Sequence, residues 1–362
     1  MTTLSGTRPS GVQIAPWVPA DEILAASSVL SSGFSTIWVP DQMLARNSHV
    51  LMSAIAAGRH VGVASGVTIP LSRNPIDIAA AMATIAELVA PGYAVQMGVG
   101  TGGSLVTSMF TRRSVLTLLR ESIGLIRRLW AGEIVLLRDY PSLSERLGWR
   151  DDAIARLSFP LTRDIPILMA IGGPKSRALA EDLADGLICT STYPAVSYAA
   201  LEAGDHETVR DVVALARRRA AAGRPFRLLY GLNCCVSNDG AAAREFGRRQ
   251  AAIVAGNPVL WPDLERAGFD MESAAMVRAA LRGGRPLPEA AQYVSDDLLD
   301  GLIVSGTPEA CAARLETLAG LIHSIGFDDF YIGSPLGPDI AEASRLLVDK
   351  VLPAVWPQEL GR

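Results

Sequence analysis

The strongest constraint on the fold is the alternation of two kinds of segment along the chain. Short apolar runs rich in β-branched residues alternate with longer alanine- and leucine-rich stretches of helical period. This pattern is typical of repeated βα units around a parallel sheet. The strands are nearly continuous apolar runs, as expected when both faces of the sheet are buried. The eight predicted strands are Val12–Ala15, Thr36–Pro40, Val61–Val67, Ala94–Gly100, Ile167–Ile171, Gly186–Thr190, Arg227–Val236 and Asp329–Ile332.

Eight βα units favour a closed barrel over an open sheet. A chain of 362 residues, 49% hydrophobic and 19% charged, can bury the core of one such barrel. Asn74-Pro75 and Thr307-Pro308 each place a capping residue before a proline at the first helical position. We therefore predict the α/β class and a (β/α)8 TIM barrel that forms a single domain over residues 1–362.

Two segments depart from this alternation. Residues 257–299 contain proline- and glycine-rich interruptions of the helical pattern and lie between the seventh and eighth predicted strands. We interpret them as an insertion near the barrel mouth. Residues 137–162 are predicted to form a long loop before the fifth strand.

The composition indicates a cytoplasmic protein with a small-molecule partner. The net charge of −4 provides no basic field for nucleic acid or anionic lipid. The sequence contains no apolar stretch of membrane-spanning length, and MTTLSGTRPSG lacks the plan of a signal peptide. The four cysteines lack metal-binding spacing, so we expect reduced thiols and no metal site. Arginine is abundant while lysine occurs only at positions 175 and 350, which suggests a GC-rich, actinobacterial genome.

In a TIM barrel the ligand site lies at the carboxyl ends of the strands. The segment Gly172–Ser176 lies there, between the fifth strand and a helix. A helix that begins directly after a strand presents free backbone N–H groups and a positive dipole end, which suit a phosphate. The other strand ends are also rich in glycine, which permits close approach of the backbone to a ligand or a plain tight turn.

Six stretches in chain order resemble the luciferase-like monooxygenase superfamily, and within it the coenzyme F420-dependent branch. They are GFSTIWVPD, GVTIPLSRNP, GVGTGG, IGGPK, ADGLICTS and VSGTPEA. The chain looks most similar to F420-dependent glucose-6-phosphate dehydrogenases and methylenetetrahydromethanopterin reductases. The resemblance implies a flavin or deazaflavin across the strand ends, with its phosphate at Gly172–Ser176. It also implies a non-proline cis peptide and a bulge at Gly66 and Val67, behind the cofactor ring.

The strand ends and the resemblance together give a set of candidate cofactor-binding residues. They are Asp41, Ser65, Gly66, Val67, Thr101, Gly102, Gly103, Gly172, Gly173, Pro174, Lys175, Ser176, Thr190 and Ser191.

The chain departs from the sugar-phosphate dehydrogenases of the family at three positions. Gln42 replaces a histidine, Gly103 replaces a glutamate, and Tyr193 stands where a lysine would hold the sugar phosphate. Glucose 6-phosphate is therefore not the expected substrate. The proton required by the reaction would come from Asp41, a tyrosine such as Tyr193, a substrate group or water, and Gln42 would make a polar contact only.

We expect an uncharged or largely apolar substrate, with the insertion as a lid. Four aromatic residues, Trp17, Trp149, Tyr193 and Trp261, are predicted either to line an apolar pocket or to belong to the core. His49 is the histidine closest in sequence to a strand end and is a further candidate for substrate binding.

Three functions are compatible with these features. The first is an F420-dependent oxidoreductase that transfers a hydride, and the second is an FMN-dependent monooxygenase of the same superfamily. The third is a cofactor-free barrel that acts as a binding or subunit-partner protein. By resemblance we expect a homodimer.

Overall fold

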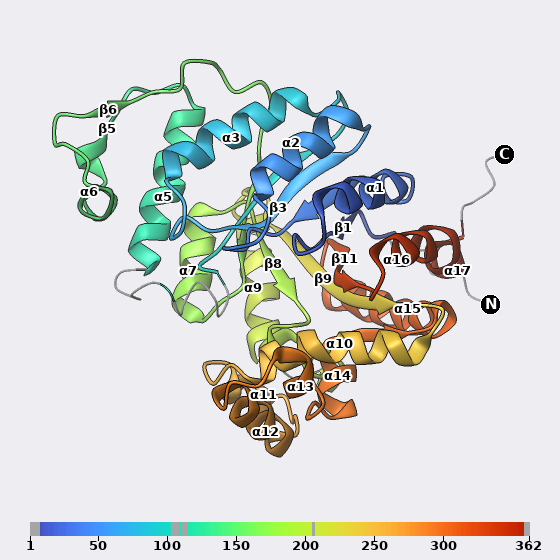
Figure 1. The fold of residues 1–362 in the computed structure, drawn as a ribbon. Coiled ribbons are helices and arrows are strands. Elements are labelled where there is room, and N and C mark those ends of the chain that lie inside the picture. The colour runs from blue at the N-terminus through green and yellow to red at the C-terminus, as the bar shows by residue number, and fades with distance from the viewer. Residues whose placement is uncertain (1–7, 103–108, 110–114, 205–206, 358–362) are drawn as a thin grey trace. The chain divides into compact units, whose positions relative to one another are not determined.

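The computed structural model describes residues 8–102, 109, 115–204 and 207–357. The chain divides into two compact units. Figure 1 labels the helices and strands of both. The first unit comprises Met1–Ala15, Asp21–Ser35 and Ile188–Arg362, and the second comprises Pro16–Ala20 and Thr36–Leu187. All eight predicted strands are present in the described residues, with bounds that differ by a few residues from the predicted ones.

The second unit contains four strands that pair in parallel in chain order. They are β2 (Thr36–Val39), β3 (Gly62–Thr68), β4 (Val95–Val99) and β7 (Ile167–Ala170). Nearly every residue of these strands is buried, which explains why the sequence shows apolar runs without alternation. The helices of this unit that follow the strands are α2 (Ser48–Gly58), α3 (Pro75–Leu88), α5 (Val115–Trp130) and α7 (Pro174–Leu183).

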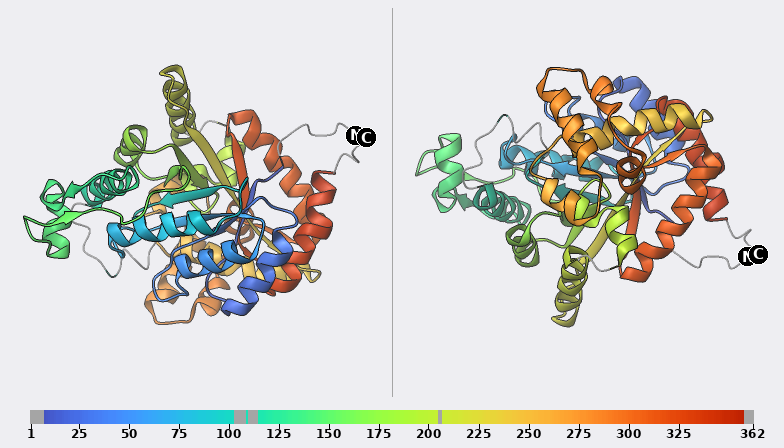
Figure 2. Two further views of the ribbon diagram at one scale, coloured as in Figure 1. Left: turned by 90° about the horizontal axis from the view of Figure 1, so that it is seen from above. Right: turned by 90° about the horizontal axis from the view of Figure 1, so that it is seen from below.

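The predicted loop over residues 137–162 contains regular structure, which corrects the prediction. It holds a short helical turn, η1 (Leu137–Asp139), and α6 (Pro141–Leu147). The antiparallel strands β5 (Val135–Leu136) and β6 (Ile154–Ala155) flank them. Such short elements carry too few apolar residues for a periodic pattern. We call β5, η1, α6 and β6 the arm of the second unit (Figure 2).

The first unit contains four parallel strands in the order β1–β11–β9–β10. They are β1 (Gly11–Gln13), β9 (Arg227–Val236), β10 (Val304–Gly306) and β11 (Asp329–Leu336). The short strand β10 was not predicted. In the sequence, β8 (Gly186–Thr190) crosses the boundary between the units. The remaining helical elements outside the insertion are α1 (Ala20–Leu30), η2 (Pro194–Val196), α8 (Tyr198–Ala203), α9 (Glu207–Ala221), α15 (Pro308–Ile325), α16 (Ile340–Leu346), η3 (Leu347–Val351) and α17 (Leu352–Val355).

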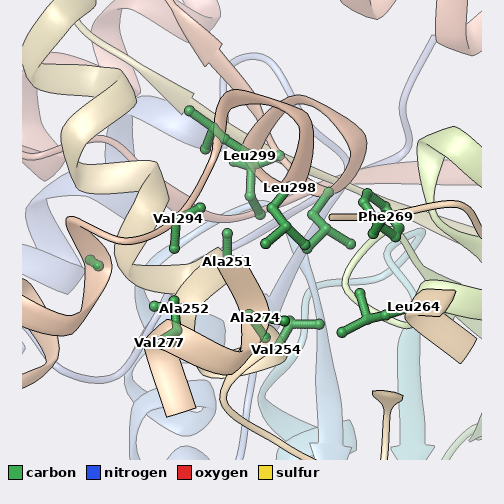
Figure 3. Close-up of a cluster of buried hydrophobic side chains, with 14 of the residues drawn as sticks. Ala251, Ala252, Val254, Leu264, Phe269, Ala274, Val277, Val294, Leu298 and Leu299 are labelled. Atoms are coloured by element: carbon green, nitrogen blue, oxygen red, sulfur yellow. The ribbon is translucent and has the colours of Figure 1, made fainter. Parts of the chain in front are cut away.

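The predicted insertion is a small group of helices with its own hydrophobic core (Figure 3). Leu264, Phe269, Val294 and Leu298 are among its buried residues, and they pack with Ala251 of the preceding helix. The insertion is therefore anchored to that helix by apolar burial. The helices concerned are α10 (Gly240–Ala255), α11 (Trp261–Arg266), α12 (Met271–Arg282), α13 (Leu287–Ala291) and α14 (Asp296–Leu302).

Among the described helices, none combines the length and the apolar character that crossing a bilayer requires.

Candidate active site

An ion pair occupies the end of β2 in the second unit. Asp41 follows β2 after Pro40 and is 6% exposed. The Arg73 guanidinium donates from Nε to Asp41 Oδ2 at 2.5 Å and from Nη2 to Oδ1 at 2.7 Å. The Thr68 hydroxyl donates to Oδ2 at 3.3 Å. The hydrogen bonds to Asp41 raise the pKa of Arg73. Both oxygens of the predicted catalytic carboxylate therefore have a cationic partner.

A bulge interrupts β3 beside this ion pair. The pairing of β3 with β4 shifts register between Ser65 and Thr68, and the Gly66–Val67 peptide bond is cis. The predicted cis peptide and bulge are confirmed. The backbone N–H of Asp41 donates to the Val67 carbonyl at 3.2 Å. Gly66 and Val67 are half-buried in an otherwise buried strand, so the bulge leaves part of the chain accessible to a ligand.

Gly100, directly after β4, contacts the bulge on the side of β3 that faces β4. Its N–H donates to the Thr68 carbonyl at 3.1 Å. A Cβ on Gly100 would lie 3.0 Å from Val67 Cγ2 and 3.2 Å from the Ala170 Cβ at the end of β7. The ends of β3, β4 and β7 meet tightly here, and glycine is the residue that fits.

Other predicted cofactor-binding residues lie at the ends of β3 and β4. The Ser65 hydroxyl is buried and donates to the Gly98 carbonyl at 2.9 Å, so its position supports the sheet. Thr101 and Gly102 are half-buried, and Gly102 has a φ of +82°, which favours glycine. Gly103 lies outside the described residues.

Two polar side chains of the second unit follow Asp41 in the sequence. Gln42 is exposed. His49 is half-buried in the first turn of α2, where its N–H donates to the capping Asn47 side chain at 3.0 Å. Its Nε2 is buried without a hydrogen-bond partner in the described residues. Burial, and then the positive charge of Arg73, lower the pKa of His49 from 6.5 to about 4 and outweigh the attraction of Asp41.

The start of α7 is the segment for which the sequence predicts an anion site. Gly173 is the capping residue, and no side chain caps the helix. The N–H groups of Ser176 and Arg177 donate to the Gly173 carbonyl at 2.9 and 3.1 Å. A Cβ built on Gly173 would meet no atom within 4 Å. The space beside Gly173 is therefore open to a ligand at the positive end of the helix.

The side chains around this helix start are also cationic or polar. A Cβ on Gly172 would lie 2.9 Å from Ser176 Oγ, so the turn is tight at that position. Arg177 is buried, and its Nη1 donates to the Gly172 carbonyl at 3.1 Å. Pro174 and Lys175 are exposed. The sequence analysis missed Arg177, although it lies one residue beyond the predicted segment.

In the first unit, Thr190 and Ser191 belong to a polar network around Asn233 of β9. Their hydroxyls donate to Asn233 Oδ1 at 2.7 and 3.0 Å. Asn233 Nδ2 donates to the Ser334 carbonyl at 2.6 Å. The Ser334 hydroxyl donates to Gln13 Oε1 of β1 at 2.9 Å. Asn233, Ser334 and Gln13 were not predicted, although each is a polar residue within an apolar run, which is a usable signal.

Trp261 belongs to the core of the insertion. Its indole N–H donates to the Ala255 carbonyl at 2.7 Å, and the Arg278 guanidinium lies 5.8 Å from the ring centroid. Trp261 packs against the buried cluster of the insertion. Trp261 was predicted either to line an apolar pocket or to belong to the core, and these contacts agree better with a role in the core. The lid function of the insertion stays a prediction.

The other predicted aromatic residues lie on different elements. Trp17 is 40% exposed, and its carbonyl accepts a hydrogen bond from Arg46 Nη1 at 2.5 Å. Trp149 is half-buried and follows α6 of the arm. Tyr193 is half-buried in the turn after β8, where its N–H donates to the Thr190 carbonyl at 2.9 Å.

Comparison with known proteins identifies a matching family and a similar reductase. Residues 18–324 match the model of the family described as luciferase-like monooxygenase. The 5,10-methylenetetrahydromethanopterin reductase of Methanolobus tindarius is 28% identical over 345 residues, which cover 93% of this chain and 98% of the relative.

Two solved structures have a similar fold. The coenzyme F420-dependent tetrahydromethanopterin reductase from Methanopyrus kandleri superposes with a TM-score of 0.72 at 19% identity, covering 96% of this chain and 99% of that one. An F420-dependent secondary alcohol dehydrogenase in complex with an F420–acetone adduct has a TM-score of 0.67 at 19% identity, with the same coverage. The predicted (β/α)8 TIM-barrel fold is confirmed.

Proposed function

This chain belongs to the luciferase-like monooxygenase family, and on that premise we propose that it is an oxidoreductase that binds coenzyme F420 and transfers a hydride to or from an organic substrate. The names of its relatives support the choice of cofactor, because both the alcohol dehydrogenase and the M. kandleri reductase are described as F420-dependent. The sequence departures at Gln42 and Tyr193 argue against glucose 6-phosphate as the substrate.

The observation that carries the proposal is the start of α7. Gly173 leaves open space at the positive end of a ten-residue helix, and no side chain caps it. The buried Arg177 and the exposed Lys175 add positive charge. An F420 or FMN phosphate suits this environment because it is anionic and accepts hydrogen bonds from backbone N–H groups. We propose that Gly172–Ser176 hold the cofactor phosphate.

We propose that the bulge in β3 contacts the cofactor ring. Gly66 and Val67 are the half-buried residues of this strand, and Thr101 and Gly102 follow the neighbouring β4. When bound, coenzyme F420 supplies a ring carbon that donates or accepts a hydride. The protein's part is to hold the ring and the substrate in a reactive geometry and to exclude water.

The contacts of the candidate residues bear on the source of the proton. The carboxylate oxygens of Asp41 are engaged by Arg73, and the amide of Gln42 does not titrate. We therefore propose that the proton comes from Tyr193, from a group of the substrate or from water.

We propose an uncharged or largely apolar substrate. Two apolar side chains on loops of the second unit are exposed, Trp17 by 40% and Leu44 by 84%. Leu44 has a φ of +66°, an unfavourable conformation for leucine that recurs at functional sites. Both residues lie in the loops after β1 and β2, where the site is expected.

We also propose that the protein is a cytoplasmic homodimer. None of the four cysteines, all of which lie in the described residues, forms a disulfide, as expected in a reducing compartment. The antiparallel register pairs Leu136 with Ile154 and places Ile134 on the same face. Ile134 and Ile154 are 58% and 62% exposed, whereas Val135 on the other face is buried. An apolar face of this kind supports self-association.

The test of the function is anaerobic titration of the purified protein with reduced and oxidised coenzyme F420 and with FMN. We expect micromolar or tighter binding of F420, about −8 kcal/mol, and FMN binding at least tenfold weaker. Copurified FMN, or oxygen consumption with reduced FMN and a substrate, would favour a monooxygenase. Binding of neither cofactor would favour a cofactor-free protein. Turnover of glucose 6-phosphate with F420 would contradict the proposed substrate class.

A further inference from the structure

We propose that Arg73 and Asp41 act together as a positioning pair for the bulge in β3, and that Asp41 affects the cofactor through this bulge rather than by transferring a proton. The inference rests on the proposed function for the identity of the ligand. Its structural part concerns contacts within the second unit alone.

Both oxygens of the Asp41 carboxylate are engaged by Arg73. The Asp41 side chain is 4% exposed, and Oδ1 and Oδ2 each accept a hydrogen bond from the Arg73 fork. A bidentate pair of this kind is short and directional. With its side chain buried and both oxygens directed at one guanidinium, Asp41 has little access to a substrate or to solvent. The arrangement suits a fixed anchor and does not suit an acid.

Asp41 also contacts the bulge through two hydrogen bonds. Its backbone N–H donates to the Val67 carbonyl at 3.2 Å, and its carboxylate accepts from the Thr68 hydroxyl at 3.3 Å. Val67 and Thr68 are the last two residues of β3 and follow directly on the half-buried Gly66. Movement of Asp41 would therefore release the edge of the bulge that lies beside β2.

Arg73 is the residue that keeps Asp41 in place. Arg73 lies only five residues beyond Thr68, so the end of β3 supplies the bulge and the loop directly after it supplies the cation that fixes Asp41. Removal of Arg73 would leave the buried carboxylate without the guanidinium that binds both of its oxygens. Asp41 would then turn toward water and pull on Val67 and Thr68.

The experiment uses the full chain and four variants: Arg73→Gln, Asp41→Asn, the double variant, and Arg120→Gln as the control. Arg120 forms an exposed ion pair with Asp182 in the same unit, so its loss leaves the bulge untouched. Hydrogen exchange of peptides over residues 61–74 reports the bulge without any ligand. Titration with oxidised coenzyme F420, followed by its absorption band, reports the bound ring. Thermal unfolding verifies that each variant is folded.

We expect Arg73→Gln to raise the exchange rate over residues 61–74 and to weaken F420 binding at least tenfold, with a shifted absorption band. The double variant should bind more tightly than Arg73→Gln alone, because asparagine removes the unpaired buried charge. Asp41→Asn should also raise the exchange rate over residues 61–74, because it removes the charged carboxylate that Arg73 binds. The control should match the wild type.

Two sets of outcomes separate the possible failures. Unchanged exchange over residues 61–74 in Arg73→Gln would overturn the positioning pair, whatever the protein binds. Unchanged exchange over the same residues in Asp41→Asn would also overturn it. Failure of the wild type to bind F420, with faster exchange in Arg73→Gln, would reject the proposed function while retaining the pair.

Discussion

The Arg73 guanidinium binds the Asp41 carboxylate through two hydrogen bonds, of 2.5 and 2.7 Å, and so joins the loop after β3 to the end of β2. The pair lies beside the bulge at Gly66 and Val67, where the chain is partly accessible. A buried carboxylate is retained here because its counter-charge and its hydrogen bonds are supplied within one unit.

The stability of the protein should depend on this pair. We expect Arg73→Gln to lower the free energy of unfolding by about 2–3 kcal/mol, because it leaves a buried carboxylate without its cation while Arg73 itself is partly exposed. Urea denaturation followed by circular dichroism measures the change. Arg120→Gln, which breaks an exposed pair, should change the same quantity by less than about 0.5 kcal/mol. Equal effects of the two substitutions would contradict this expectation.

Binding of the cofactor phosphate should depend on Gly173. Valine at this position would place its side chain in the open space beside the start of α7, so we expect Gly173→Val to weaken F420 binding at least tenfold, about 1.4 kcal/mol. Fluorescence titration of the cofactor gives the affinity.

Ala178→Val is the matched control for this prediction, because Ala178 lies in the same helix and is exposed. It introduces the same side chain away from the helix start and should leave the affinity unchanged. Unaltered affinity in Gly173→Val would place the phosphate site elsewhere.

The pH dependence of stability should reflect His49. The fold lowers the pKa of His49 from 6.5 to about 4, so between these values the unfolded chain binds more protons than the folded protein. This contribution to stability is complete above pH 6.5 and is lost as the pH falls toward 4. We expect His49→Gln to show a smaller loss of stability over this range than the wild type, measured by denaturation at a series of pH values.

The exposed His323 supplies the control for that comparison. His323→Gln should follow the wild-type pH dependence of stability. If the free energy of unfolding of His49→Gln changed with pH as steeply as that of the wild type, the His49 imidazole would not contribute to the pH dependence of stability.

The oligomeric state should depend on the arm. If the proposed homodimer uses the apolar face at Ile134 and Ile154, then Ile154→Lys should convert it to monomers, because each copy would bring a charge into a shared apolar contact. Light scattering coupled to gel filtration measures the mass. Val259→Lys, at an exposed position of the insertion, should leave the dimer intact. A dimer that tolerates Ile154→Lys would exclude the arm from the interface.

Several parts of the site were predictable because they follow from local sequence. Gly173 and Pro174 predict a helix that begins directly after a strand, and α7 does begin at Pro174. The resemblance of GVTIPLSRNP to the family placed the bulge at Gly66 and Val67, where the structure has it. The assignment of these residues to the cofactor stays a prediction.

Other parts were not predictable because they depend on contacts between distant segments. Arg73 lies 32 residues from Asp41, and no periodicity links a loop arginine to a particular carboxylate. Asn233 meets Thr190 across 43 residues and Ser334 across 101. The arm was predicted as a loop because its strands of two residues are too short to produce an alternating pattern.

The βα repeat, the positions of the eight barrel strands and several helix starts could be predicted from the sequence, because they follow from apolar periodicity and from capping within a few residues. Which polar side chains are partners depends on the folded chain. In the folded chain, Asp41 pairs with Arg73, His49 Nε2 has no hydrogen bond in the described residues, and Trp261 packs against the core of the insertion. The physical reason is that burial and hydrogen bonding depend on three-dimensional proximity, which local sequence patterns do not encode.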